Sequence, residues 1–180
     1  MDKHLQSSLT RLLTIFFAVW VLSWGLASSI ASADSPEKIT IGWLETVQIV
    51  PENFQLAAKI DTGADNSSLS ITNPTEFQKE EQSWIRFTIP LGEEQAITLE
   101  RPIKRYTRIK RKGAASLKRT IVLMDLCVGT LFKEDVPVNL ADRTGFKFPM
   151  LIGRSFLKGS AIVDSDLTLT QSSICEAAPE

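Results

Sequence analysis

The alternation of apolar and polar residues along the chain predicts a succession of short β-strands. Apolar side chains recur at every second position, or in short runs bounded by Gly, Pro, Asn and Asp, as is typical of strands and turns. Phe156 and Leu157 begin the one short helix that we expect. The chain therefore predicts an all-β domain. Residues 39–50 are predicted to form strands around an irregular centre. The further predicted strands are 54–60, 67–71, 83–89, 96–99, 120–128, 136–140, 150–154, 161–163 and 167–169.

The N-terminal segment follows a different pattern. Basic residues precede an apolar run over 12–26, which is followed by small residues up to Ala33. This order is typical of a secretory signal peptide. The alternative is an uncleaved membrane anchor, because the apolar stretch continues to Ile30 and nearly reaches the length that crosses a bilayer. We predict a signal peptide at 1–33, a mature domain at 34–180, and a periplasmic or secreted location, with membrane attachment only if the segment is retained.

Composition and charge narrow the class of protein. The chain has 180 residues, of which 43% are hydrophobic, and a formal net charge of -1. These values describe one globular domain, and the near-neutral charge gives no reason to expect nucleic acid as a partner. The only histidine, His4, lies in the signal segment, so Ser-His and Cys-His hydrolase mechanisms are excluded from the mature domain. Cys127 and Cys175 could pair within the chain, pair between chains or remain free, and two cysteines cannot by themselves complete a tetrahedral zinc site.

The turn most suggestive of chemistry contains an aspartate and a glycine. The predicted strand 54–60 leads directly into Asp61-Thr62-Gly63. Glycine permits a close backbone approach at such a turn, and the threonine hydroxyl can hydrogen-bond to a neighbouring segment. A carboxylate held in this way suits a catalytic acid or base. The triplet alone is a weak signal, since aspartate and glycine are also common in ordinary structural turns.

A pair of such carboxylates could hydrolyse a peptide bond. Two carboxyl groups that lie close together cannot both ionise easily, so one keeps its proton while the other activates a water molecule. This chemistry needs neither a metal nor a histidine. Because the mature chain is too short for two lobes, the second carboxylate has to come from a second copy of the chain in a symmetric homodimer.

Two separate motifs strengthen this interpretation. Residues 59–65 read Lys-Ile-Asp-Thr-Gly-Ala-Asp, and residues 151–157 read Leu-Ile-Gly-Arg-Ser-Phe-Leu. In this order, with a glycine-containing hairpin between them, they resemble the retropepsin family of aspartic proteases. The resemblance implies a closed barrel-like retropepsin fold with one short helix, and an aspartic-type peptidase that acts on peptide or protein substrates as a homodimer.

The same resemblance implies roles for individual residues. Asp61 would be the catalytic aspartate, Thr62 would brace the two catalytic turns across the dimer, and Gly63 would border the substrate cleft. A partly buried charge pair between the turn and the helix would fix the geometry of the site more than it would stabilise the fold. The residues expected to support the turn and the cleft are Ala64, Asp65, Ile152, Gly153 and Arg154, with Asp65 facing Arg154.

A narrower resemblance covers most of the mature chain. It is to the bacterial retropepsin-like group labelled ATP-dependent zinc proteases. That label does not fit this sequence, which has no Gly-rich phosphate loop ending in Gly-Lys-Ser/Thr and no His or Cys cluster for zinc. We therefore expect no ATP, metal or other cofactor. The segments that carry the resemblance are 41–43, 58–64, 101–102, 109–110, 127–129, 138–143 and 148–154.

A basic stretch lies between the two motifs. Residues 101–119 contain nine basic residues and no acidic one, with glycine near the centre. We interpret the stretch as a hairpin whose tip is a flap that closes over the substrate, where its charge would attract acidic peptides or anionic polymers. The alternative is a solvated β-ribbon whose charges prevent edge pairing. The predicted flap residues are Lys110, Arg111, Lys112, Gly113 and Ala114.

Two further positions need an interpretation. Lys59 lies two residues before the catalytic aspartate, where alternation along the strand predicts a side chain that points to solvent. Asp164-Ser165-Asp166 follows an apolar strand but lacks the glycine of a second catalytic turn, so we expect it to form a plain turn.

The sequence thus predicts an exported, retropepsin-like endopeptidase with an active site shared between two chains. The alternative is a non-catalytic module that binds a peptide or a partner protein on the same fold.

Overall fold

The computed structural model describes residues 37–92, 95–111, 114–143, 145–171 and 175. These residues belong to one compact unit, Pro36–Glu180. The predicted signal peptide lies outside the described residues. Within the described ranges, no helix is both long enough and apolar enough to cross a membrane.

Strands account for most of the described chain, and one short helix accompanies them. The strands are β1 (Ile39–Val50), β2 (Phe54–Ile60), β3 (Ser67–Ser70), β4 (Thr72–Lys79), β5 (Gln82–Pro90), β6 (Ala96–Pro102), β7 (Arg105–Arg111), β8 (Ala114–Val128), β9 (Leu131–Ala141), β10 (Met150–Ile152) and β11 (Ala161–Thr168). The helix is α2 (Arg154–Leu157). It begins two residues before the predicted start of the helix at Phe156.

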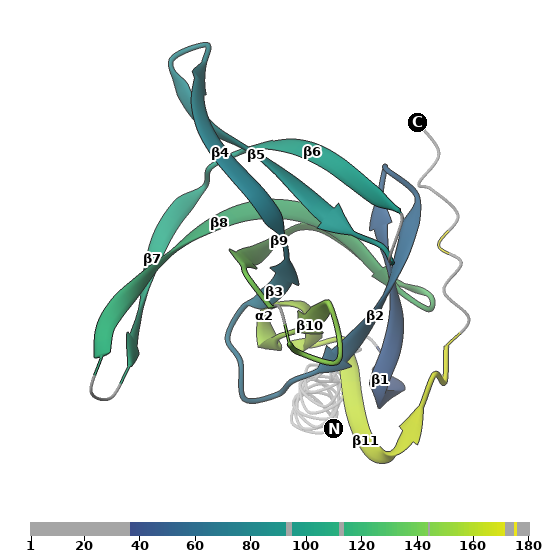
Figure 1. Cartoon of the computed structure of the whole chain (residues 1–180). Helices are drawn as coiled ribbons and strands as arrows, with labels where there is room; N and C mark the ends of the chain where they lie inside the picture. The colour runs from purple at the N-terminus through teal and green to yellow at the C-terminus, as the bar shows by residue number, and fades with distance from the viewer. Residues whose placement is uncertain (1–36, 93–94, 112–113, 144, 172–174, 176–180) are drawn as a thin grey trace, which may run out of the picture. The chain divides into compact units, whose positions relative to one another are not determined.

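Six strands form a closed barrel. The larger sheet has the order β11-β1-β2-β10-β3-β9-β8-β7, and an additional pairing of β1 with β8 closes the ring from β1 to β8. In that pairing Gln48 lies opposite Cys127 and Val50 opposite Asp125. Outside the ring, β11 pairs with β1 and β7 pairs with β8, as Figure 1 shows. The prediction of an all-β, closed barrel-like fold is therefore confirmed.

Alternation along β2 explains how the barrel buries its core. Phe54, Leu56, Ala58 and Ile60 are buried, while the residues between them are exposed. Lys59 is one of the exposed residues, as predicted. An apolar side chain at every second position places a continuous apolar surface on one face of the strand. This strand ends at the Asp61 turn, so the turn is attached to the core.

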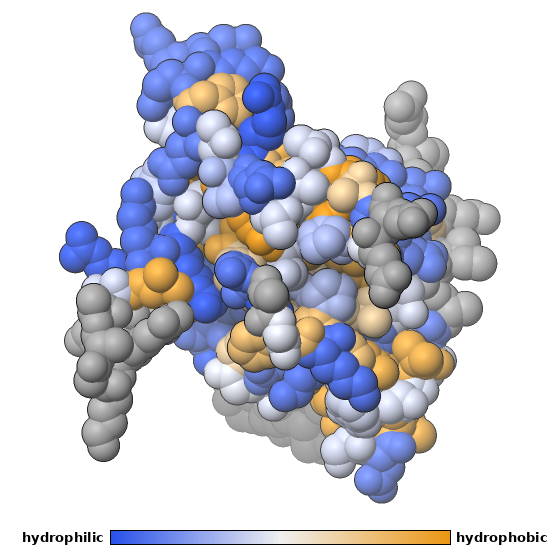
Figure 2. All heavy atoms as spheres, in the orientation of Figure 1, coloured by the Kyte–Doolittle hydropathy of each residue, from blue (hydrophilic) through white to orange (hydrophobic). Residues whose placement is uncertain are grey.

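A separate three-stranded sheet is inserted between β3 and β7. Its order is β4-β5-β6. Strand β4 was not predicted, because nearly all its residues are exposed and its apolar residues do not alternate. Asn73 and Pro74 are residue types common in loops, and Asn73 has a positive φ of 51° in the structure. Figures 1 and 2 show the β4–β5 hairpin projecting from the barrel with a mainly hydrophilic surface.

The C-terminal residues are held to the barrel by a buried carboxylate. Glu45 on β1 is fully buried, and Gly42 N donates to its Oε1 over 2.6 Å. The backbone N and the Oγ1 of Thr170 donate to the same oxygen over 3.1 and 2.6 Å. Buried charge is tolerated only where such donors replace water. A disulfide between Cys127 and Cys175 attaches the chain end to β8.

One local prediction was wrong. Asp164-Ser165-Asp166 does not separate two strands, but lies within the single strand β11. The pairing of β11 with β1 shifts register between Gly42 and Leu44, opposite this segment. There the Asp166 amide donates to Asp164 Oδ1 over 2.9 Å. The turn-like composition therefore marks an irregularity inside a strand.

Reduction of the disulfide is expected to lower the free energy of unfolding by about 2–4 kcal/mol. The bond closes a loop with a sequence separation of 48, and opening it returns chain entropy to the unfolded state. Urea unfolding of the full chain with and without reductant measures the difference. Without reductant, Cys175→Ser should have the same lowered free energy of unfolding as the reduced original chain. Equal unfolding midpoints for the oxidised chain, the reduced chain and this variant would contradict the expectation.

Candidate active site

The Asp61 carboxylate is oriented by the turn that carries it. The backbone N of Asp61 donates to Ile152 O over 2.9 Å, which ties the turn to the neighbouring strand β10. Gly63 N donates to Asp61 Oδ1 over 3.0 Å, and Ala64 N donates to Asp61 O over 3.2 Å. Asp61 is half-buried, whereas Thr62 and Gly63 are exposed. The carboxylate is therefore held in place while remaining accessible from solvent.

Gly153 packs directly against the chain that leaves the Asp61 turn. A Cβ at this position would lie 2.6 Å from both C and O of Asn66 and 3.0 Å from Ala64 O. These are backbone atoms, so they cannot move away as a flexible side chain could. Gly153 N also donates to Ser67 Oγ over 3.2 Å. The second motif thus supports the first by a contact that only glycine permits.

Arg154 connects the helix α2 to the turn. Its backbone N donates to Ala64 O over 2.9 Å, and its Nη1 donates to Thr62 O over 2.8 Å. Its Nη2 forms the predicted ion pair with Asp65. The two side chains are 49% and 82% exposed, so the pair is a surface interaction and not the partly buried one that was expected. Exposed pairs contribute little stability, which leaves Arg154 a geometric role.

A cleft lies beside the Asp61 turn. It has a volume of about 430 Å³ and is lined by the turn, by β9 and β10, and by the base of the β7–β8 hairpin. Thr107 and Arg119 come from the hairpin, Asn139 from β9 and Leu151 from β10. The hairpin predicted from the basic stretch is therefore present, and its base reaches the cleft.

The predicted flap tip is described only in part. Arg111 and Ala114 pair at the end of the hairpin, which places the tip between them. Lys112 and Gly113 lie outside the described residues. Lys110 belongs to β7. The hairpin is thus located by its backbone, and its use as a flap stays a prediction.

Two arginines contribute positive charge near Asp61. Burial lowers the pKa of the Arg143 guanidinium, the charge of Arg119 lowers the pKa further, and the Asp61 carboxylate opposes both. Arg143 lies over the Phe146 ring, 4.5 Å from its centroid. Its Nε is buried without a hydrogen-bond partner among the described residues. The charges of Arg119 and Asp61 therefore act in opposite directions on the pKa of Arg143.

Several lining residues were missed by the sequence reasoning. Asn139 lies between Val138 and Leu140 in an apolar strand, and a polar residue there was an available signal. It is buried, and its Nδ2 donates to Ser67 O over 3.2 Å. The sequence does not distinguish Arg119 from the other basic residues of 101–119 as a residue of the cleft. Its position in the cleft depends on the register of β8 with β9.

The turn presents the Asp61 carboxylate in one orientation, held by the Gly63 amide. Within the part of the chain that the structure describes, no three His, Cys, Asp or Glu side chains gather as ligands for one metal ion. A closed six-stranded barrel with a braced Asp-Thr-Gly turn defines the class of retropepsin-like domains.

The family follows from comparison with known proteins. The model of the RimB-like family, described as retropepsin-like aspartic endopeptidase RimB, matches residues 40–173. The chain therefore belongs to this family. It is also similar to a Legionella pneumophila protein of unknown function, Lpg0085, with 30% sequence identity and a TM-score of 0.65, over 74% of this chain and 98% of that one.

Curated relatives carry the name "Probable alpha-L-glutamate ligase". The relative from Parasynechococcus marenigrum is 28% identical over 116 residues, which cover 62% of this chain and 24% of the relative. The relative from Desulfotalea psychrophila is 28% identical over 117 residues, which cover 62% of this chain and 25% of the relative. The match thus spans about a quarter of the length of these relatives.

Gly153→Ala is expected to lower the free energy of unfolding by about 1–3 kcal/mol, because the added methyl group overlaps backbone atoms. Gly92→Ala is the matched control, since a Cβ at Gly92 meets nothing within 4 Å. Urea unfolding of both variants and the original chain measures the effect. Equal losses in the two variants would show that the packing at Gly153 is not the cause.

Proposed function

We propose that the protein is an aspartic-type endopeptidase in which two copies of the chain bring two Asp61 carboxylates together around one water molecule. The observation that carries this proposal is the braced turn. The carboxylate accepts the Gly63 amide, and the turn is tied to Ile152 and packed on Gly153. Membership in a family described as retropepsin-like aspartic endopeptidases supports the same reaction.

The proposed reaction is an acid and base process. One carboxylate of the pair takes a proton from the water as it attacks the peptide carbonyl carbon, while the protonated partner donates to the carbonyl oxygen. Proton transfer to the leaving nitrogen then breaks the peptide bond. The preorganised turn contributes by keeping each carboxylate in one orientation, so less reorganisation is needed during the reaction.

The second carboxylate has to come from another chain. Thr62 and Gly63 are exposed at the turn, so the turn is free to meet a symmetric copy. In the proposed dimer Thr62 braces the two turns and Gly63 borders the peptide. The β7–β8 hairpin acts as the flap, which is supported by Thr107 and Arg119 lining the cleft at its base.

The proposed location is the periplasm or the exterior of the cell. A signal peptide at 1–33 would direct export. The Cys127–Cys175 disulfide supports this location, since disulfides persist in oxidising compartments.

The proposed substrate is an acidic peptide. Arg119 lines the cleft, and Arg143 lies close enough for its pKa to respond to both Arg119 and Asp61. Guanidinium groups bind carboxylates through charge-assisted hydrogen bonds. The names of the curated relatives, which refer to a ligase for glutamate, agree with a glutamate-rich chain as the substrate.

A non-catalytic binding module is the second candidate. It is favoured by the relatives, in which a segment similar to this chain accounts for only about a quarter of a protein named as a ligase. Such a segment could hold an acidic peptide without cutting it. The two candidates share the cleft and differ only in whether Asp61 acts on a bound peptide.

Asp61→Asn is expected to reduce peptide cleavage by at least about 100-fold, because an amide cannot act as general base. Asp164→Asn is the matched control, since Asp164 lies within β11 and outside the cleft. Cleavage of glutamate-rich peptides is followed by mass spectrometry, and sedimentation reports the oligomeric state. Full cleavage by Asp61→Asn would refute the catalytic assignment. Cleavage by a strictly monomeric protein would refute the shared site.

Arg119→Gln is expected to raise KM for a glutamate-rich peptide by roughly 10-fold, because it removes a charged hydrogen-bond donor from the cleft. Arg86→Gln is the control, since Arg86 pairs with Glu100 on the separate three-stranded sheet. Added salt should weaken the glutamate preference of the original chain by screening. An unchanged KM in Arg119→Gln, or equal turnover of glutamate and glutamine peptides, would contradict acidic specificity.

A further inference from the structure

A second and larger cavity adjoins the cleft. Its volume is about 580 Å³, within the range of roughly 300–1,000 Å³ that is typical of ligand pockets. It lies between the inserted sheet and the barrel, with β4 and β5 on one side and β8 and β9 on the other. Arg119 lines both this cavity and the cleft beside the Asp61 turn, so the two hollows meet at one side chain.

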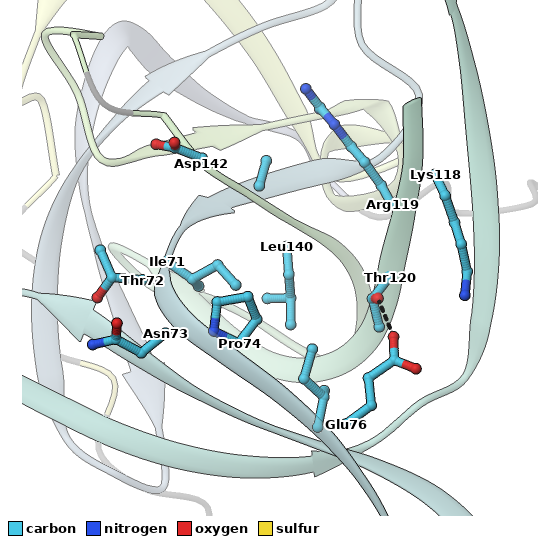
Figure 3. A pocket seen from close by; sticks show the side chains of 12 residues that line it. Ile71, Thr72, Asn73, Pro74, Glu76, Lys118, Arg119, Thr120, Leu140 and Asp142 are labelled. Atoms are coloured by element: carbon cyan, nitrogen blue, oxygen red, sulfur yellow. Dashed lines mark hydrogen bonds between the residues drawn. The ribbon is translucent and has the colours of Figure 1, made fainter. Parts of the chain in front are cut away.

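The centre of the cavity is apolar. Figure 3 shows Ile71, Pro74 and Leu140 pointing into its middle, while Arg119, Thr120 and Asp142 stand around the rim. Ile71 and Leu140 are largely buried, at 6% and 5% exposure. Moving further apolar surface into this space would be favourable, whereas a charge placed on this floor would lose its hydration.

The charged groups of the rim already have protein partners. Tyr106 Oη donates to Glu76 Oε2 over 2.9 Å, and Thr120 Oγ1 donates to Glu76 Oε1 over 3.4 Å. Lys118 Nζ lies 3.5 Å from the centroid of the Tyr106 ring. Arg119 and Asp142 each interact with another residue as well. An apolar group could therefore enter without leaving a rim charge unpaired.

The same contacts hold the cavity open before any ligand arrives. Glu76 belongs to β4, whereas Tyr106 and Thr120 belong to β7 and β8, so their hydrogen bonds join the inserted sheet to the base of the hairpin. The Glu76 hydrogen bond raises the pKa of the Tyr106 hydroxyl, with smaller contributions from burial and from the Glu76 charge. Tyr106 thus stays protonated and continues to donate.

We propose that this cavity is a specificity subsite of the Asp61 cleft, and that it takes one bulky apolar side chain of the bound peptide, at some distance from the scissile bond. The inference rests on the proposed function for the presence of a peptide in the cleft. The acidic residues of that peptide lie along the side of the cleft that Arg119 lines. The apolar residue passes Arg119 and enters the cavity. The inserted sheet β4-β5-β6 has the role of the subsite wall.

The test measures binding separately from cleavage. A set of glutamate-rich peptides carries a single Phe, or Ala in its place, at each position in turn. The full Asp61→Asn chain is used for binding by calorimetry, and the full original chain for kcat/KM. At one position, Phe is expected to bind about 10-fold or more tightly than Ala, because a side chain of this size is removed from water.

Two variants on β4 test whether the preference for Phe arises in the cavity. Thr72 lines the cavity at an exposed position of β4, and Thr72→Trp is expected to fill the space and remove the Phe preference. Thr75→Trp is the matched control, because Thr75 is equally exposed on β4 and does not line the cavity. Both sites are on the surface, so the core is preserved and the preference should survive in Thr75→Trp.

The outcomes separate this inference from the proposed function. A Phe preference in binding that Thr72→Trp removes, without cleavage by the original chain, would support the subsite and refute the peptidase. Cleavage without a Phe preference at any position would overturn the subsite alone. The subsite would also be overturned if the preference persisted in Thr72→Trp, or if no peptide bound.

Discussion

The close contact between Gly153 and the backbone after the Asp61 turn is the constraint on which the site depends. The glycine and the chain at 64–66 approach so closely that a methyl group would overlap backbone atoms. This approach brings Ile152 O to the amide of Asp61, and it lets α2 begin where Arg154 reaches Thr62. One packing contact thus positions the carboxylate, the turn and the helix together.

The barrel supplies the stiffness that makes this contact useful. Buried residues of β2 and β10, with Ile60 opposite Ile152, anchor both motifs to the same core. Closure of the ring by β1 and β8 leaves these strands no free edge, so their positions are determined from both sides. Lys59 of β2 is exposed on the outside of this frame, whereas Glu45 of β1 is buried inside it. Arg119 occupies the junction of the cleft and the adjoining cavity because its neighbours on β8 are paired with β7 and β9.

Much of the fold could be predicted because its strands alternate or are continuously apolar. β2 was predicted with its observed bounds, whereas β1 is one strand where strands around an irregular centre were predicted. The turn motif and the Gly153 motif were recognised by residue type. Strand β4 was missed because its stability comes from pairing with β5 and not from burying an alternating face. β11 was divided in two because its polar centre resembles a turn, although it continues along β1. The exposure of the Asp65–Arg154 pair depends on the orientation of α2, which the local sequence pattern does not predict.

The sequence by itself determined the fold class, the catalytic-type turn and the residues that brace it. These features are local, since hydrophobic periodicity specifies strands and a short run of residue types specifies a turn. Only the tertiary structure decided which basic residue lines the cleft, that Asn139 and Thr107 join it, and that Cys127 pairs with Cys175. Those facts depend on strand register and on the insertion of β4-β5-β6, which bring together residues far apart in the chain. Side chains so far apart in the sequence come together only in the folded barrel.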